Sequence, residues 1–89
     1  MHTDEYEISL ARELAVCERY VRASREFLRR MEARHGMSTD ELLARRRTVS
    51  LPAGVLRDWR DAHEMHRRWS TTRDEYRALL GGMKQSAPE

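Results

Sequence analysis

Two stretches of the chain carry a regular pattern of apolar positions. In the first, the pattern advances by alternating steps of four and three residues, through Leu10, Leu14, Cys17, Val21, Ser24, Leu28 and Met31. This spacing, typical of coiled coils, places side chains on one face of an α-helix. Since no glycine or proline interrupts it, it predicts a long helix over about residues 6–35. Tyr6, Tyr20 and Phe27 widen its apolar face.

The second stretch repeats this spacing through Val55, Trp59, Ala62, His66, Trp69, Arg73, Tyr76 and Leu80. It predicts a second long helix over about residues 52–80, with Pro52 in the first turn, where its missing N–H costs nothing. Gly81 and Gly82 are expected to end this helix and to leave residues 81–89 as a tail. Because Arg73 lies on the apolar face, we expect it to meet an acidic partner or to extend into solvent.

The segment between the two helices has the residues of a tight corner. Gly36 can adopt the left-handed backbone conformation that closes a helix at no steric cost. Ser38 and Glu41 have the spacing of a capping box, in which each side chain accepts a hydrogen bond from the backbone N–H of the other residue. We therefore expect a short helix over about residues 39–46, followed by a loop to Leu51.

These elements predict one all-α domain over residues 1–89, an antiparallel hairpin of two long helices with a short helix at the corner. The apolar faces are broader than a single hairpin covers, and a chain this short often completes its core by association. We therefore expect a four-helix arrangement in a homodimer. The large aromatic residues on these faces are the candidates for the dimer or partner interface: Tyr20, Phe27, Trp59, Trp69 and Tyr76.

Charge narrows the choice of partner only slightly. The net charge of +2 comes from 17 basic and 15 acidic residues that are intermixed, so nucleic-acid binding is permitted but not indicated. The candidate phosphate contacts are Arg45, Arg46 and Arg47. The simpler interpretation of these three arginines is a solvated edge of the loop. A DNA-binding helix-turn-helix is not expected, because its recognition helix would have to be the second long helix, which is too long for that role.

No combination of residues indicates catalysis, so we do not expect an enzyme. The chain differs from the small all-helical chorismate mutases, which have arginine-lined sites, because it has no lysine before Lys84. Cys17 lies on the apolar face and is interpreted as a small core residue, with a redox role or an intermolecular bridge as the alternative. One cysteine allows no internal disulfide, and no stretch is apolar enough to span a membrane, so we expect a cytoplasmic protein.

Metal binding is the remaining chemical possibility. Glu32 and His35 have the E-x-x-H spacing used by carboxylate-bridged di-iron bundles, and His63 and His66 lie three residues apart on the other long helix. Such a site needs several inward carboxylates in the apolar middle of a bundle, whereas Glu32 lies beside the corner. We therefore predict no metal and no cofactor, with His63 and His66 half-buried and hydrogen-bonded.

A wider motif consists of Tyr20, Phe27, Glu32, the run His35-Gly36-Met37-Ser38, Glu41-Leu42, Trp59 and Tyr76. With these residues the chain resembles, over residues 20–80, a group of small uncharacterised prokaryotic all-helical proteins, some similar to antitoxins of toxin–antitoxin pairs. The run Leu51-Pro52-Ala53-Gly54 departs from that group, which usually has a glycine and acidic residues before the tryptophan. The resemblance implies a protein-interaction module that binds a small toxin. The alternative is a nucleic-acid-binding accessory protein that uses Arg45–Arg47.

Overall fold

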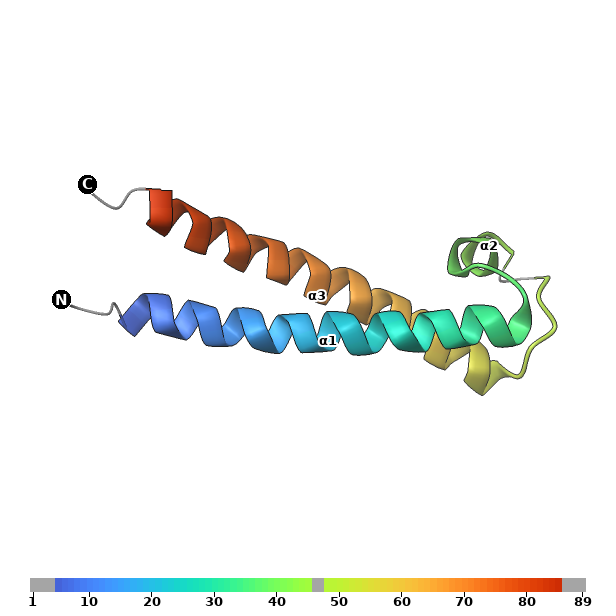
Figure 1. Cartoon of the computed structure of the whole chain (residues 1–89). Coiled ribbons are helices and arrows are strands. Elements are labelled where there is room, and N and C mark those ends of the chain that lie inside the picture. The colour runs from blue at the N-terminus through green and yellow to red at the C-terminus, as the bar shows by residue number, and fades with distance from the viewer. Residues whose placement is uncertain (1–4, 46–47, 86–89) are drawn as a thin grey trace.

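The computed structural model describes residues 5–45 and 48–85, and these residues form a long hairpin of three helices (Figure 1). Helix α1 spans Glu5–His35, α2 spans Thr39–Ala44 and α3 spans Ala53–Gln85. The long helices α1 and α3 pack against each other in opposite directions, while α2 lies at the corner (Figure 1). The molecule measures 60 × 18 × 17 Å. The all-α hairpin predicted from the apolar pattern is therefore confirmed.

Helix α1 buries the face that its sequence pattern predicts. Its five buried residues all belong to the four-and-three pattern, and they are Leu10, Cys17, Val21, Leu28 and Met31. The two other members of the pattern, Leu14 and Ser24, are half-buried. Acidic residues in the first turn and basic residues in the last turn complement the helix dipole, which stabilises both ends.

The corner between α1 and α2 has the predicted backbone geometry. Gly36 has a φ of 66°, and its N–H donates to the carbonyl oxygen of Glu32 at 2.9 Å. The Ser38 hydroxyl accepts from the Glu41 N–H at 3.1 Å, and the Glu41 carboxylate accepts from the Ser38 N–H at 3.4 Å. The capping box is therefore present. Helix α2 ends at Ala44, and the Arg45 N–H donates to carbonyl oxygens of its last turn.

Helix α3 differs from the prediction at its C-terminal end. It continues through Gly81 and Gly82 to Gln85, so the expectation that these glycines end the helix is wrong. A glycine inside a helix costs only about 1 kcal/mol relative to alanine, and it does not prevent helical backbone angles. Among the described residues, Gly36 is the only glycine with a positive φ. Of the predicted tail, residues 86–89 lie outside the part of the chain that the structure describes.

The hydrophobic core is concentrated at the corner end of the hairpin. Leu28 and Met31 from α1, Leu42 from α2 and Trp59 from α3 form one buried cluster, in which Leu42 and Trp59 have no exposed surface. Half-buried residues pack around it, namely Phe27, Met37, Val49, Leu51, Val55, Leu56 and Ala62. Toward the other end the ribbons of α1 and α3 diverge (Figure 1). The corner end is thus a closed core of three helices, and the free end is a more open pair.

Substitutions at the corner should reduce stability by different mechanisms. A Cβ at Gly36 would meet no atom within 4 Å, so the cost of Gly36→Val comes from the left-handed backbone and should exceed ~1 kcal/mol. Gly36→Asn is the matched control and should cost less, since asparagine tolerates this conformation. Ser38→Ala should cost ~1 kcal/mol through loss of the cap. Urea unfolding curves that leave Gly36→Val and Ser38→Ala at wild-type stability would contradict this description.

Candidate interaction surfaces

Glu32 and His35, considered above as a metal motif, instead contact residues of the corner. The Glu32 carboxylate accepts a hydrogen bond from the backbone N–H of Thr39 at 2.7 Å, at the start of α2. The Thr39 hydroxyl in turn accepts from the indole N–H of Trp59 at 3.0 Å, and the His35 ring stacks on Trp59 with centroids 5.5 Å apart. Thr39 is buried, and sequence reasoning assigned it no role. These contacts join α1, α2 and α3.

Within residues 5–45 and 48–85, no three His, Cys, Asp or Glu side chains come together as metal ligands. His63 and His66 are both half-buried, as expected. The Nδ1 atom of His66 lies 3.0 Å from the Ser24 hydroxyl, so this histidine is hydrogen-bonded across the hairpin. Ser24 occupies a position of the apolar pattern, and this bond explains how a polar residue is accommodated there.

Burial lowers the pKa of His66 below its ordinary value of 6.5, and the guanidinium of Arg25 lowers it further. A backbone hydrogen bond with Val21 acts in the opposite direction, while Arg73 and His63 add smaller lowering effects. The imidazole is therefore neutral at neutral pH. The two arginines come from different helices, so positive charge from both helices converges near His66.

Cys17 is a buried core residue, with 1% of its surface exposed. Burial raises the pKa of its thiol, and the nearby carboxylates of Glu13 and Glu18 raise it further. The thiolate is the reactive form of cysteine, and here it is disfavoured. The side chain therefore fits the interpretation as a small hydrophobic residue in the helix interface.

A second line of apolar residues follows α3 beside its buried face. It consists of Met65, Trp69, Thr72, Tyr76 and Leu79, spaced by four, three, four and three residues. Met65 and Leu79 are 46% and 47% exposed. From α1, the ring of Tyr20 stacks on Trp69 with centroids 4.6 Å apart, and Tyr20 remains 47% exposed. We call these six residues the apolar stripe.

Two adjoining hollows lie along the apolar stripe and share Thr72. One, of about 480 Å³, is lined by Met65, Arg68, Trp69 and Thr72. The other, of about 570 Å³, is lined by Thr72, Glu75, Tyr76, Ala78 and Leu79. Three of the predicted interface aromatics, Tyr20, Trp69 and Tyr76, belong to the stripe. By contrast, Trp59 is a core residue of the single chain, and Phe27 packs half-buried against that core.

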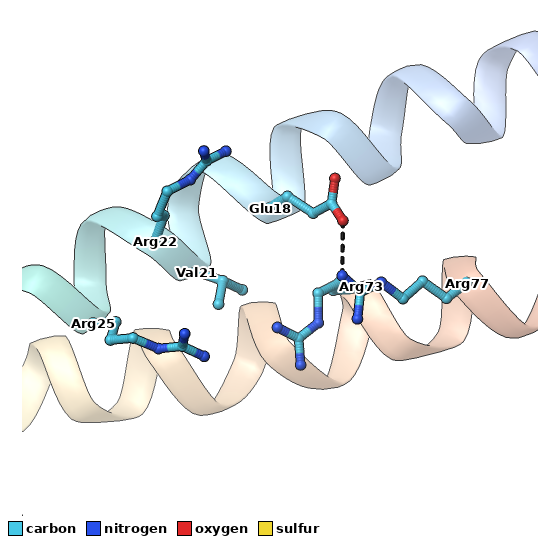
Figure 2. Close-up of a pocket in the computed structure, with 6 residues that line it drawn as sticks. All are labelled: Glu18, Val21, Arg22, Arg25, Arg73 and Arg77. Atoms are coloured by element: carbon cyan, nitrogen blue, oxygen red, sulfur yellow. Dashed lines mark hydrogen bonds and ion pairs between the residues drawn. The ribbon is translucent and has the colours of Figure 1, made fainter.

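A groove of different character lies between α1 and α3. It has a volume of about 390 Å³ and is lined by Glu18, Val21, Arg22, Arg25, Arg73 and Arg77 (Figure 2). We call it the arginine groove. The side chain of Arg73 is only 19% exposed and its Nε donates to the Asp74 carboxylate at 3.1 Å, which provides the acidic partner expected for an arginine on the apolar face. Sequence reasoning did not bring these arginines together.

Only one of the three candidate phosphate contacts lies within the described residues. Arg45 is exposed at the end of α2, whereas Arg46 and Arg47 lie outside the described residues. No described helix is both long and apolar enough to cross a bilayer.

Mild acid should reduce the stability of the fold through His66. The folded state lowers the pKa of this histidine, so below about pH 6.5 the unfolded chain takes up the proton more readily. The contribution of His66 to stability should therefore be constant above that pH and fall as the pH drops toward the folded pKa. His66→Gln, which cannot titrate, should show a smaller loss between about pH 7.5 and 5.5 in urea unfolding. Equal losses in the two proteins would contradict the assignment.

Comparison with known proteins gives no match: no protein-family model, no curated protein and no solved structure matches this chain. Its function must therefore be argued from its own surfaces.

Proposed function

We propose that this protein is a protein-interaction module: two copies pair through the apolar stripe, and the pair is the antitoxin-like partner of a small toxin. The exposed apolar stripe on α3 is the observation that carries the first part of this proposal. The sequence resemblance to antitoxin-like proteins suggests the class of partner.

The apolar stripe leaves large apolar side chains on the surface of a small protein. Met65, Tyr20 and Leu79 are each exposed by two-fifths or more, and they lie on one flank of the hairpin together with Trp69 and Tyr76. Contiguous exposed apolar surface of this kind marks sites of association in soluble proteins. The stripe runs from Met65 to Leu79, about 21 Å of helix, so the proposed interface would extend along neighbouring turns of α3 to reach the roughly 800 Å² per partner that stable interfaces bury.

The order of residues along the stripe favours a second copy as the occupant. Met65 lies seven residues before Thr72, and Leu79 lies seven residues after it. Trp69 lies three residues before Thr72, and Tyr76 lies four residues after it. An antiparallel pair of α3 helices related by a two-fold axis at Thr72 would therefore place apolar residues opposite apolar residues. Each copy would present the same surface to the other, as a two-fold interface requires.

Charges beside the stripe fit the same arrangement. Arg68 lies four residues before Thr72 and lines one hollow, while Glu75 lies three residues after Thr72 and lines the other. In the antiparallel pair, Arg68 of each copy would lie near Glu75 of the second copy. A parallel pair related by a two-fold axis would not form this contact, because the side of α3 that carries Arg68 and Glu75 would then face the side that carries Trp69 and Tyr76. The antiparallel pair would generate a four-helix arrangement with one α1 on each side.

The oligomeric state tests the stripe directly. Light scattering at micromolar concentration should give the mass of a dimer. Met65→Glu and Leu79→Glu should each weaken self-association by about tenfold or more, because each buries a charge in an apolar contact. Ala15→Glu is the matched control, because Ala15 is exposed on α1 about 140° around the helix from Tyr20 of the stripe, and it should leave the dimer intact. A wild-type monomer, or a dimer unaffected by the two stripe substitutions, would contradict the proposal.

Charge exchange tests the antiparallel register. Arg68→Glu and Glu75→Arg should each weaken the dimer, and the double variant should recover most of the loss, since the pair is restored with reversed signs. Two single variants whose effects simply add in the double variant would exclude this register.

Binding to a toxin-like protein encoded by a neighbouring gene tests the second part of the proposal. Affinity should come from desolvated apolar anchors and change little between about 50 and 200 mM salt, whereas phosphate binding weakens by orders of magnitude over this range. Replacing Arg45, Arg46 and Arg47 with Ala should leave fold and partner binding intact. Tight binding to duplex or single-stranded nucleic acid that collapses at the higher salt, and is lost in the triple variant, would instead favour the accessory role in nucleic-acid binding.

A further inference from the structure

The arginine groove lies on the flank of the hairpin opposite the apolar stripe. Glu18, which lines the groove, precedes Tyr20 of the stripe by two residues on α1, a separation of about 200° around a helix. The groove is therefore available whether or not the stripe is covered, and its function is independent of the proposed dimer.

Guanidinium groups enter the arginine groove from both long helices. Arg25 from α1 and Arg73 from α3 extend toward each other, with Val21 between the helices beside them (Figure 2). Arg22 points away from the other three arginines at the edge of the groove (Figure 2). The lowered pKa of His66 is consistent with this geometry, because Arg25 and Arg73 both contribute to it.

The positive charge of the groove is only partly compensated within the protein. Its lining contains four arginines and one glutamate, a net charge of +3. Glu18 is engaged by Arg77 at 2.9 Å, and Asp74, the partner of Arg73, is outside the lining and 64% exposed. Within the described part of the chain, neither Arg22 nor Arg25 forms an ion pair. Arginine side chains that extend into one open groove produce a local positive potential, which favours binding of an anion.

We propose that the arginine groove binds a compact, multiply charged phosphate ligand such as a diphosphate group. A planar guanidinium donates two parallel hydrogen bonds to a phosphate, and guanidinium groups on opposite sides of a groove suit an anion with oxygens on all sides. A volume of about 390 Å³ falls in the range of small-molecule sites. The carboxylate of Glu18, held at the Arg77 side of the groove, would repel a nucleic-acid backbone running through it.

Calorimetric titration with inorganic pyrophosphate tests this proposal on the whole protein. The wild type should bind pyrophosphate at about 150 mM salt, and Arg25→Gln with Arg73→Gln should weaken binding by about tenfold or more. The matched control, Arg19→Gln with Arg60→Gln, removes the same charge from exposed positions on the same two helices and should change affinity less than about twofold. Far-ultraviolet circular dichroism melts establish that both double variants are folded.

A second readout separates binding in the groove from binding elsewhere. An anion between Arg25 and Arg73 offsets their effect on His66, so saturating pyrophosphate should raise the pKa of His66 in an NMR titration of its ring. Failure to bind pyrophosphate, equal binding by the two double variants, or an unchanged His66 pKa would each overturn the proposal. Binding of an oligonucleotide without binding of pyrophosphate would also overturn it, in favour of a nucleic-acid surface.

Discussion

The burial of one indole N–H organises the corner of this protein. Trp59 has no exposed surface, so its N–H cannot bond to water and must find an acceptor in the protein. Thr39 supplies that acceptor because the capping box fixes the start of α2 beside Trp59, and Glu32 binds the Thr39 backbone N–H from α1. The hydrogen bonds thus depend on all three helices being in place together. The buried apolar cluster of Leu28, Met31, Leu42 and Trp59 surrounds this network.

The three-helix cluster lies at the corner, and away from it the hairpin is a pair of helices with exposed apolar side chains. Away from the corner, α1 and α3 contact each other as a pair (Figure 1). Tyr20, Met65 and Leu79 retain nearly half of their surface exposed. The opposite flanks of this pair differ in chemistry, since one carries the apolar stripe and the other the arginine groove. A two-helix rod can in this way present two chemically different surfaces without a second domain.

The sequence predicted the buried face of α1 and the corner well, because both depend on local rules. The four-and-three spacing and the S-x-x-E box act within one or two helical turns, so they can be recognised in the sequence without knowledge of the tertiary structure. The end of α3 was missed because glycine only weakens a helix, and Gly81 and Gly82 keep helical backbone angles.

Surfaces that depend on tertiary structure were harder to predict. Trp69 and Tyr76 belong both to the buried pattern on α3 and to the apolar stripe, so periodicity alone could not separate the two sets. Arg25 and Arg73 are far apart in the sequence, and only the pairing of α1 with α3 brings them to one groove. The role of Glu32 and His35 likewise depends on Thr39 and Trp59, which the E-x-x-H spacing does not reveal.

The central claim is that the corner is stable within one chain whereas the free end is completed by a second copy. Amide hydrogen exchange measured across a dilution series tests it most directly, because local protection reports local stability. Amides around Trp59 and Met31 should be strongly protected at every concentration. Amides of residues 65–79 should be protected at high concentration and lose that protection on dilution, as mass action requires. Equal protection of both ends at all concentrations would contradict the account.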